Sequence, residues 1–131
     1  MKGLDTNVLV RLLVADDARQ ANRAAHYVGR ECTAENPCLL NRVVLCELVW
    51  VLERAYGHDR NDIAAALEKV LRTTEFLIED AESAWAALFA YRARAADFAD
   101  AVIARSNRGL GCAATATFDR RAARLDGFEP V

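Results

Sequence analysis

The first fourteen residues place one acid, Asp5, at the joint between two apolar segments. Residues 1–5 are short enough for a strand that ends at the acid, and residues 6–14 have the spacing of an amphipathic helix. In open α/β sheets, ligands bind just beyond the carboxyl ends of the strands, so Asp5 stands where chemistry usually takes place. Asp5 or Thr6 can also simply cap the helix. The two interpretations weigh about equally until the positions of the other acids are known.

Short apolar segments alternate with helical segments along the rest of the chain. Strands are expected over residues 1–5, 37–40, 75–79, 112–117 and 128–131. Helices are expected between them, over residues 6–14, 18–30, 42–56, 58–71, 81–91, 97–108 and 120–125. This alternation is typical of a parallel sheet covered by helices on both faces. The sequence therefore predicts one α/β domain over residues 1–131, with a central parallel sheet of about four to five short strands.

Composition limits the class of protein. The chain has 131 residues, is 53% apolar and carries a net charge of −2, so we expect a folded domain. No segment resembles a signal peptide, and Arg11 and Asp16 interrupt the first apolar run well before membrane-spanning length. A soluble, cytoplasmic protein without a membrane partner is therefore expected. The near-neutral charge also argues against a protein held to nucleic acid by bulk charge alone.

The four cysteines carry no recognisable spacing. Two of them lie in apolar segments, where a free cysteine behaves as a small hydrophobic residue. The two histidines lie in polar helical segments and add no zinc-binding pattern. We therefore expect neither a zinc site nor a disulfide framework. All four are expected to be packing residues in a reducing compartment: Cys32, Cys38, Cys46 and Cys112.

Glu47 lies in the middle of a strongly apolar helical segment, residues 42–56. Helical geometry puts Val43, Trp50 and Arg54 on its face, and the opposite side is apolar too. A helix that is apolar all round is normally buried, so we expect Glu47 to be at least partly buried. A carboxylate in that position is paired, protonated or bound to a metal ion. Because Arg54 lies two turns away and capping cannot explain an acid in mid-helix, a functional role is favoured.

Three further acids, Asp97, Asp100 and Asp119, lie after strands or at the starts of helices. Each of them alone can stabilise a helix start as a cap or through the helix dipole. Right-handed crossovers of parallel strands, however, bring such joints to the edge of the sheet where Asp5 also lies. Clustered carboxylates repel one another unless a cation lies among them, and such ligands suit Mg²⁺ or Mn²⁺. A site of this kind can activate water and neutralise the charge of a phosphodiester.

Four short segments, in this order, resemble the PIN (PilT N-terminus) domain: residues 4–10, Glu47 in its apolar helix, residues 97–104 and residues 117–119. The sequence is most similar to the VapC toxins of bacterial VapBC toxin–antitoxin pairs, and the resemblance covers nearly the whole chain. It implies a Mg²⁺-dependent endoribonuclease, with Mn²⁺ as an alternative metal. It also implies an RNA substrate, inhibition by a cognate VapB-like antitoxin and a homodimeric state.

Carried over residue by residue, the resemblance implies a catalytic and metal-binding quartet of Asp5, Glu47, Asp100 and Asp119. Asp97 matches a further acid that can hold the metal through water. Asp100 is favoured as the closer ligand because it directly precedes the apolar Ala-Val-Ile-Ala. Polar residues beside the acids are expected to orient them by hydrogen bonds; they are Thr6, Asn7 and Thr117. Candidate phosphate contacts, for which solvated surface is the commoner role, are Arg11, Arg42, Arg105 and Arg120.

Two other classes of function use some of the same residues. Haloacid-dehalogenase-like phosphatases need a second Asp where this chain has Asn7, and response-regulator receivers need a late lysine, whereas this chain has only Lys2 and Lys69. An aspartate-based phosphotransfer enzyme is therefore disfavoured. A non-catalytic PIN-like module that binds RNA or protein is the other alternative. Loss of an acid would indicate such a module, and all four acids of the quartet are present.

Overall fold

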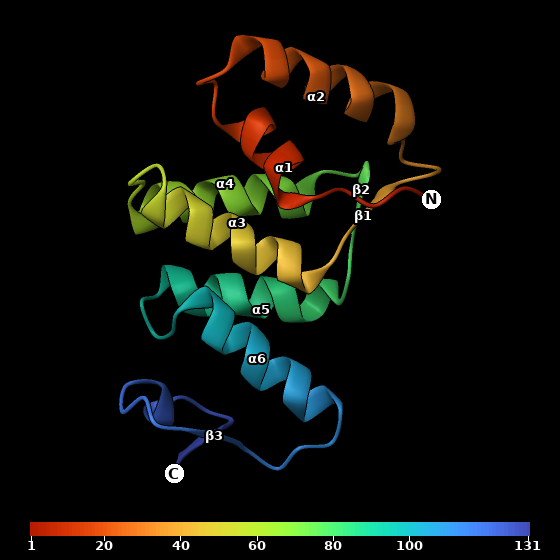
Figure 1. Cartoon of the computed structure of the whole chain (residues 1–131). Coiled ribbons are helices and arrows are strands. Elements are labelled where there is room, and N and C mark those ends of the chain that lie inside the picture. Colours follow the sequence, from red (N-terminus) through yellow and green to blue (C-terminus); the bar gives the residue numbers. More distant parts are fainter. The chain divides into compact units, whose positions relative to one another are not determined.

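The computed structural model describes all residues from Met1 to Val131 and contains six α-helices and four short strands (Figure 1). The chain divides into two compact units, Met1–Ala81 and Glu82–Val131, called unit 1 and unit 2 and described one at a time. None of the helices has the length and apolarity needed to cross a membrane. The predicted α/β class with parallel strands is confirmed.

Unit 1 contains four helices and two strands in the order expected from the sequence. They are α1 (Thr6–Leu13), α2 (Ala18–Glu31), β1 (Cys38–Leu40), α3 (Arg42–Arg54), α4 (Arg60–Arg72) and β2 (Phe76–Ile78). The side chains of Asp17, Asn41 and Asp59 accept hydrogen bonds from backbone amides and so fix the starts of α2, α3 and α4. The core of the unit is rich in leucine, whereas α2 contributes no buried residue to it.

The parallel segments of unit 1 end at one common edge. β1 pairs with β2, and the residues before α1 run parallel beside β1 through a bridge between Gly3 and Leu39. The β1–β2 pairs are Cys38 with Phe76, Leu39 with Leu77 and Leu40 with Ile78. The carboxyl ends of these three adjacent segments are followed by Asp5, Asn41 and Glu79. In open α/β sheets, ligands bind beyond such an edge, and in unit 1 three polar side chains follow it.

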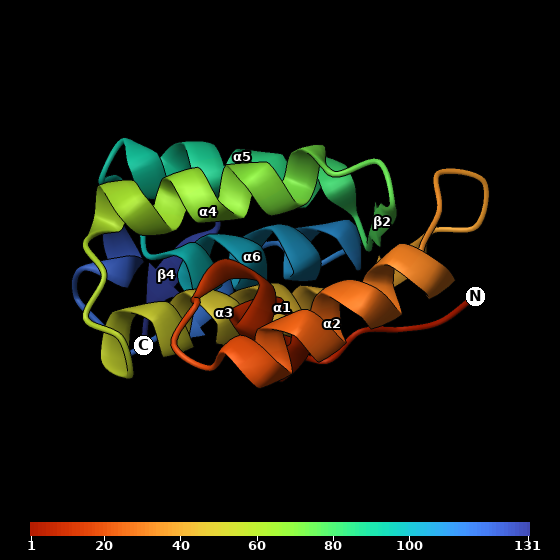
Figure 2. The same ribbon diagram turned by 90° about the horizontal axis from the view of Figure 1, so that it is seen from above.

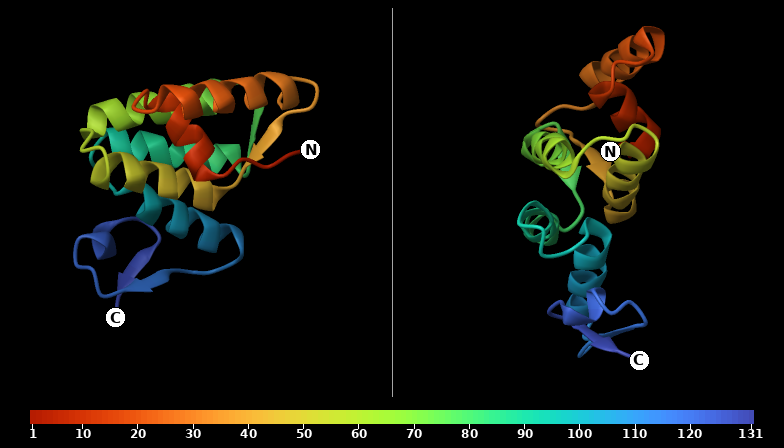
Figure 3. Two further views of the ribbon diagram at one scale, coloured as in Figure 1. Left: turned by 45° about the horizontal axis from the view of Figure 1, so that its top comes forward. Right: turned by 90° about the vertical axis from the view of Figure 1, so that its left-hand side faces the viewer.

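Unit 2 starts within the first turn of α5 (Ala81–Arg92). It continues with α6 (Phe98–Gly109), β3 (Thr115–Thr117), the short 3₁₀-helix η1 (Ala122–Arg124) and β4 (Phe128–Pro130), seen in two views in Figure 3. Tyr91 and Phe98 pack edge to face, with ring centroids 6.5 Å apart, and join α5 to α6. β3 and β4 are parallel, and Gly127 makes the turn before β4 with a φ of +92°. A Cβ at Gly127 would lie 3.2 Å from that of Ala104, so glycine suits this turn.

The prediction of one central sheet of about four to five strands is wrong, because the strands form two separate two-stranded sheets, β1–β2 and β3–β4. Every strand is only three residues long, and the first five residues contribute a single bridge. The strand predicted over residues 112–117 begins only at Thr115, because the amides of Gly111 and Cys112 bond back to carbonyl groups of α6 and close that helix. The helix predicted over residues 120–125 is reduced to η1.

The cysteines also differ from the expectation. Cys32, the C-cap of α2, and Cys38, the first residue of β1, form a disulfide, and both are buried. Hydrogen bonds within residues 33–36 close the intervening turn, which brings the two Cα atoms to 5.1 Å. Spacing along the sequence gives no sign of such a pair. The other two cysteines are free; they are the half-buried Cys46 and the exposed Cys112, although packing was expected for both.

Candidate metal centre

Thr6 links the two acids of unit 1 that were expected in the metal site. Its backbone amide donates to Asp5 Oδ1 at 2.7 Å, and its hydroxyl donates to Glu47 Oε1 at 2.8 Å. Thr6 is the one buried residue of the chain that is neither apolar nor a cysteine or tyrosine, so both bonds are partly shielded from water. Asp5 is also the N-cap of α1, and the Asn7 amide group donates to Asp5 Oδ2 at 3.4 Å. The start of α1 thereby fixes both carboxylates.

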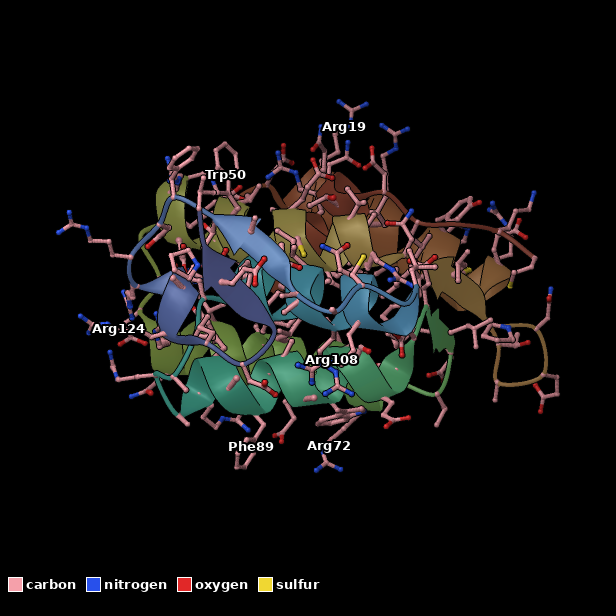
Figure 4. All side chains as sticks on the ribbon, turned by 90° about the horizontal axis from the view of Figure 1, so that it is seen from below. Arg19, Trp50, Arg72, Phe89, Arg108 and Arg124 are labelled. Carbon is pink, nitrogen blue, oxygen red and sulfur yellow. A yellow bond between two sulfur atoms is a disulfide. The ribbon has the colours of Figure 1, made fainter.

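Glu47 is exposed, so the expected burial of this carboxylate is wrong. The same face of α3 carries Val43 and Trp50, which are 61% and 55% exposed; Figure 4 labels Trp50. Five other apolar residues anchor α3 to the core, so a helix that is apolar all round is still buried on one side only. The guanidinium of Arg54 lies over the Trp50 ring, 5.3 Å from its centroid, and forms no ion pair with Glu47. The ion-pair explanation for Glu47 is therefore removed.

Glu79, which the sequence-based prediction assigned no role, follows β2 at the same edge of unit 1. Its Oε1 accepts hydrogen bonds of 2.9 Å from the backbone amide of Arg42 and from the Nε of the same residue. These bonds, the backbone one most strongly, hold the pKa of Glu79 below its usual value. Because Arg42 is the first residue of α3, the pair fastens the helix that carries Glu47 to the end of β2. The available signal was an acid at the end of a predicted strand, but Glu79 belongs to none of the PIN-like segments.

The carboxyl groups of Asp97 and Asp119 in unit 2 act on that of Asp100. Burial is the main reason that the pKa of Asp100 is raised. The negative charges of Asp97 and Asp119 raise the pKa of Asp100 further, whereas the positive charge of Arg121 lowers it. The ionised form of Asp100 is therefore disfavoured without a metal, and a cation beside it would oppose that effect.

Hydrogen bonds to nearby backbone amides account for one oxygen of Asp119, whereas Asp97 makes no capping bond. The Oδ1 atom of Asp119 accepts hydrogen bonds from the amides of Arg121 and Ala122, at 2.8 and 3.2 Å. The amide of Asp119 donates to the Thr117 hydroxyl at 3.0 Å, which holds the backbone at the end of β3. Asp97 occupies the N-cap position of α6, yet its side chain makes no capping hydrogen bond. The backbone bonds of Asp119 thus leave its second oxygen for another ligand, and capping does not explain the side chain of Asp97.

The expected acids form two groups, Asp5 with Glu47 in unit 1 and Asp97 with Asp100 and Asp119 in unit 2. Within neither unit do three or more carboxylate, imidazole or thiolate side chains converge closely enough to hold one metal ion. The donors in both groups are carboxylate oxygens, with no histidine or cysteine among them. This set of hard ligands fits Mg²⁺ or Mn²⁺ rather than zinc.

The four arginines expected to contact phosphate differ in how they are held. Arg11 and Arg42 form ion pairs within unit 1. The guanidinium of Arg105 lies 3.9 Å from Glu82, and its buried Nε has no hydrogen-bond partner. Arg120 is exposed and has no intramolecular partner. Arg120 is therefore the one member of this set whose charge is fully available.

Two comparisons with known proteins concern the chain as a whole. The PIN domain family matches residues 3–128, a range that contains all five acids. The chain is also similar to a VapC ribonuclease of Aquifex aeolicus (strain VF5), with 28% identity over 131 residues, which is all of this chain and 96% of that protein. No solved structure matches the chain. The family match spans almost the whole sequence and both units, and this chain therefore belongs to the PIN domain family.

Proposed function

We propose that this protein is a Mg²⁺- or Mn²⁺-dependent endoribonuclease that cleaves phosphodiester bonds of RNA. Membership of the PIN domain family and similarity to a VapC ribonuclease support the proposal. The observation that carries it is the position of Thr6, which holds Asp5 and Glu47 beside each other although they lie far apart in the sequence. The mutual repulsion of the acids in unit 2 adds support, because a fold that keeps like charges together indicates a cation-binding role.

In this proposal the metal ligands are Asp5, Glu47, Asp100 and Asp119, with Asp97 acting through a water molecule. Asp100 is the closer ligand of the pair on α6, because its side chain is the more buried of the two. When bound, the metal supplies Lewis-acid activation of water and neutralises charge on the phosphodiester. Carboxylate oxygens are the ligands that such an ion prefers.

The chain's own residues orient these acids. The Thr6 hydroxyl occupies Glu47 Oε1, which leaves the second oxygen of Glu47 for a ligand. The Thr6 amide and the Asn7 side chain restrain the two oxygens of Asp5 from opposite ends of its carboxylate. The Thr117 hydroxyl accepts from the backbone amide of Asp119, which fixes the backbone position from which the Asp119 side chain extends. Such supporting bonds commonly change metal affinity or activity about 10- to 100-fold when they are removed.

We further propose that the enzyme is the toxin of a type II toxin–antitoxin pair, a cytoplasmic homodimer neutralised by a VapB-like antitoxin. The similarity to a VapC protein supports this assignment. The alternative of a non-catalytic PIN-like module differs in one measurable property, since such a module binds RNA or protein without cleaving RNA. An aspartate-based phosphotransfer enzyme gains no support, because the amide of Asn7 that contacts Asp5 cannot exchange a proton as a second acid would.

The test is cleavage of a pool of transfer, ribosomal and messenger RNA by the purified full-length chain, with Mg²⁺ or Mn²⁺ and with EDTA. We expect discrete cuts that EDTA removes and that Asp5→Asn lacks. Asparagine caps a helix as well as aspartate does, so the variant should keep its fold and melting temperature. Asp59→Asn is the matched control, because Asp59 caps α4 and lies outside both groups of acids.

Two results would count against the proposal. Cuts that persist in EDTA or in Asp5→Asn would refute a metal site that includes Asp5. Absence of cleavage, together with absence of Mn²⁺ binding by calorimetry, would establish the non-catalytic module instead. Mn²⁺ binding without cleavage of this pool would leave the metal site standing and point to a narrower RNA substrate.

A further inference from the structure

A groove between α1 and α2 begins beside the acids of unit 1. Its volume is about 850 Å³, and Figure 2 shows the two helices that form it side by side. Asn7 lies at one end, and its amide group is the one that contacts Asp5 Oδ2. The other lining side chains with hydrogen-bonding or aromatic groups include Arg11, Arg23, His26, Tyr27 and Arg30. The groove therefore leads from a proposed metal ligand along the surface of α2.

The lining of this groove is basic, although the chain as a whole carries a net charge of −2. Three arginines and one histidine line it, and no aspartate or glutamate does. Arg11 is fixed in place by bonds to Asp16 and to neighbouring polar side chains. Arg23 and His26 are exposed and have no intramolecular partner, so their donors are available to a bound anion.

The α2 helix is anchored at both ends although it adds nothing to the core. None of its residues is buried. At its start, Gln20 accepts a hydrogen bond of 2.6 Å from Arg11, and at its end Cys32 forms the disulfide with Cys38. Because α2 is held in place at both ends without contributing to the core, we expect its role to lie in its exposed face. That face is the basic wall of the groove.

We infer that this groove binds a single-stranded segment of the RNA substrate next to the bond that is cut, an inference that rests on the proposed ribonuclease function. Arg23 and His26 donate to backbone phosphates, and arginine suits such contacts. Tyr27, whose ring already lies 5.6 Å from the guanidinium of Arg30, offers a stacking surface for a base. A groove of this size matches small-ligand sites and holds a few nucleotides, not a duplex.

An acidic protein segment is the competing occupant, and the lining favours RNA over it. Helices that dock in grooves present an apolar stripe to an apolar surface. Only Val8, Ala24 and Tyr27 among the lining residues are apolar or aromatic, and the rest are polar or basic. Proximity to Asp5 also places the groove where an RNA strand must pass if Asp5 acts in its cleavage.

The experiment measures RNA binding separately from cleavage. The full-length Asp5→Asn variant is titrated with a short fluorescein-labelled RNA, single-stranded or annealed to its complement, and anisotropy is followed over a range of salt concentrations. In this background, Arg23→Ala/His26→Ala should weaken binding of the single strand by about tenfold or more, as expected when charge-assisted hydrogen bonds are removed. The slope of log affinity against log salt should fall by about 0.7 for each phosphate group that the variant no longer neutralises.

Arg19→Ala is the matched control. Arg19 is an exposed arginine on the same helix without an intramolecular partner, it does not line the groove, and Figure 4 shows it projecting outward. We expect Arg19→Ala to bind RNA as the Asp5→Asn parent does, and Arg23→Lys with His26 intact to restore most of the salt dependence. Equal losses of affinity for Arg19→Ala and Arg23→Ala/His26→Ala would show a general charge effect and overturn the inference.

Two further outcomes separate the inference from the proposed function. If the wild-type chain cleaves RNA and Arg23→Ala/His26→Ala binds and cleaves as wild type does, the groove inference fails and the ribonuclease stands. If poly-glutamate binds the chain through Arg23 while RNA does not, the groove is a protein-docking site and the inference fails. If the wild-type chain cleaves no RNA but Asp5→Asn binds the single strand through Arg23, the binding site stands and the ribonuclease proposal fails.

Discussion

The two groups of acids are held in opposite ways. In unit 1, Thr6 donates one hydrogen bond to Asp5 and one to Glu47, so both carboxylates are oriented without any ion. In unit 2, the charges of Asp97 and Asp119 act against the ionised form of Asp100. Carboxylates that are already oriented can bind a metal ion without rearranging. Carboxylates that repel one another are stabilised in their ionised form when a metal ion binds. Under the proposed function, metal binding should therefore stabilise unit 2. It should leave the arrangement of the acids in unit 1 largely unchanged.

The largest effect is expected from Asp100→Asn, because it removes a ligand and relieves a repulsion at once. Cleavage should fall by about a thousandfold or more, as is common when a group that stabilises the transition state is removed. The melting temperature of the metal-free protein at neutral pH should rise, because the folded state disfavours the charge that this substitution removes. Activity assays and thermal melts in EDTA check the two parts.

The sign of this stability effect depends on pH. The folded-state pKa of Asp100 is raised above that of the unfolded chain, about 3.9 for aspartate, so ionisation lowers the free energy of unfolding as pH rises. The advantage of Asp100→Asn should thus be absent in acid and present at neutral pH. Asp62→Asn is the control, because Asp62 is the third residue of α4 as Asp100 is of α6. A destabilisation of Asp100→Asn equal to that of Asp62→Asn would show that only the helix dipole is involved.

Thr6→Val tests the other side of the comparison, the orientation of the acids in unit 1. It removes the hydroxyl that orients Glu47 and keeps the shape of the side chain. Cleavage should fall about 10- to 100-fold, and the free energy of unfolding should change by no more than about 1 kcal/mol. Thr6→Ser, which restores the hydroxyl, should recover most of the activity. Thr73→Val is a control, because the Thr73 hydroxyl bonds only to a backbone carbonyl of α4. Full activity of Thr6→Val would mean that Glu47 needs no orientation.

A third difference between the units is the disulfide, which is confined to unit 1. Closing a loop between residues six apart restricts the unfolded chain and should stabilise unit 1 by about 2 kcal/mol. Cys32→Ser/Cys38→Ser, or reduction of the wild-type chain, should lower the urea midpoint and speed hydrogen exchange in α2 and β1. Exchange in α6 of unit 2 should not change. Cys112→Ser, at an exposed free cysteine, should leave both quantities as they are.

Local sequence signals predicted most of the elements, because they act within a few residues. The helix expected over residues 18–30 is α2 (Ala18–Glu31), and the side chain of Asp17 fixes its start by accepting from the amide of Gln20 at 3.0 Å. The run of residues 42–56 likewise predicted α3, which ends at Arg54. Asp5, placed at the end of the first extended segment, does lie at the edge where three parallel segments of unit 1 end. Caps and apolar periodicity are sufficient evidence for elements of this kind.

Features that depend on distant parts of the chain could not be predicted in the same way. The exposure of Glu47 depends on which side of α3 meets the core, and an apolar pattern on all sides does not reveal that side. The bond between Thr6 and Glu47 joins residues 41 apart in the sequence. Glu79 was missed because its partner, Arg42, lies 37 residues away. The pairing of three-residue strands could not be predicted either, because a pattern of three residues does not favour one partner or register over another.

The smallest effect is expected from Glu79→Gln, which tests whether α3 must be fastened to β2 for Glu47 to act. Loss of the charge-assisted bonds to Arg42 should cost about 1 kcal/mol of the free energy of unfolding, because the pair is partly exposed. The folded-state pKa of Glu79 is lowered, so its stabilisation is present above the unfolded-state pKa and is lost as pH falls through the folded-state value. Glu79→Gln should remove this part of the acid sensitivity, whereas Glu75→Gln, at the other end of β2, should not. If stability falls but cleavage does not, Thr6 alone is sufficient to hold Glu47, and the geometry of unit 1 depends on α1 rather than on β2.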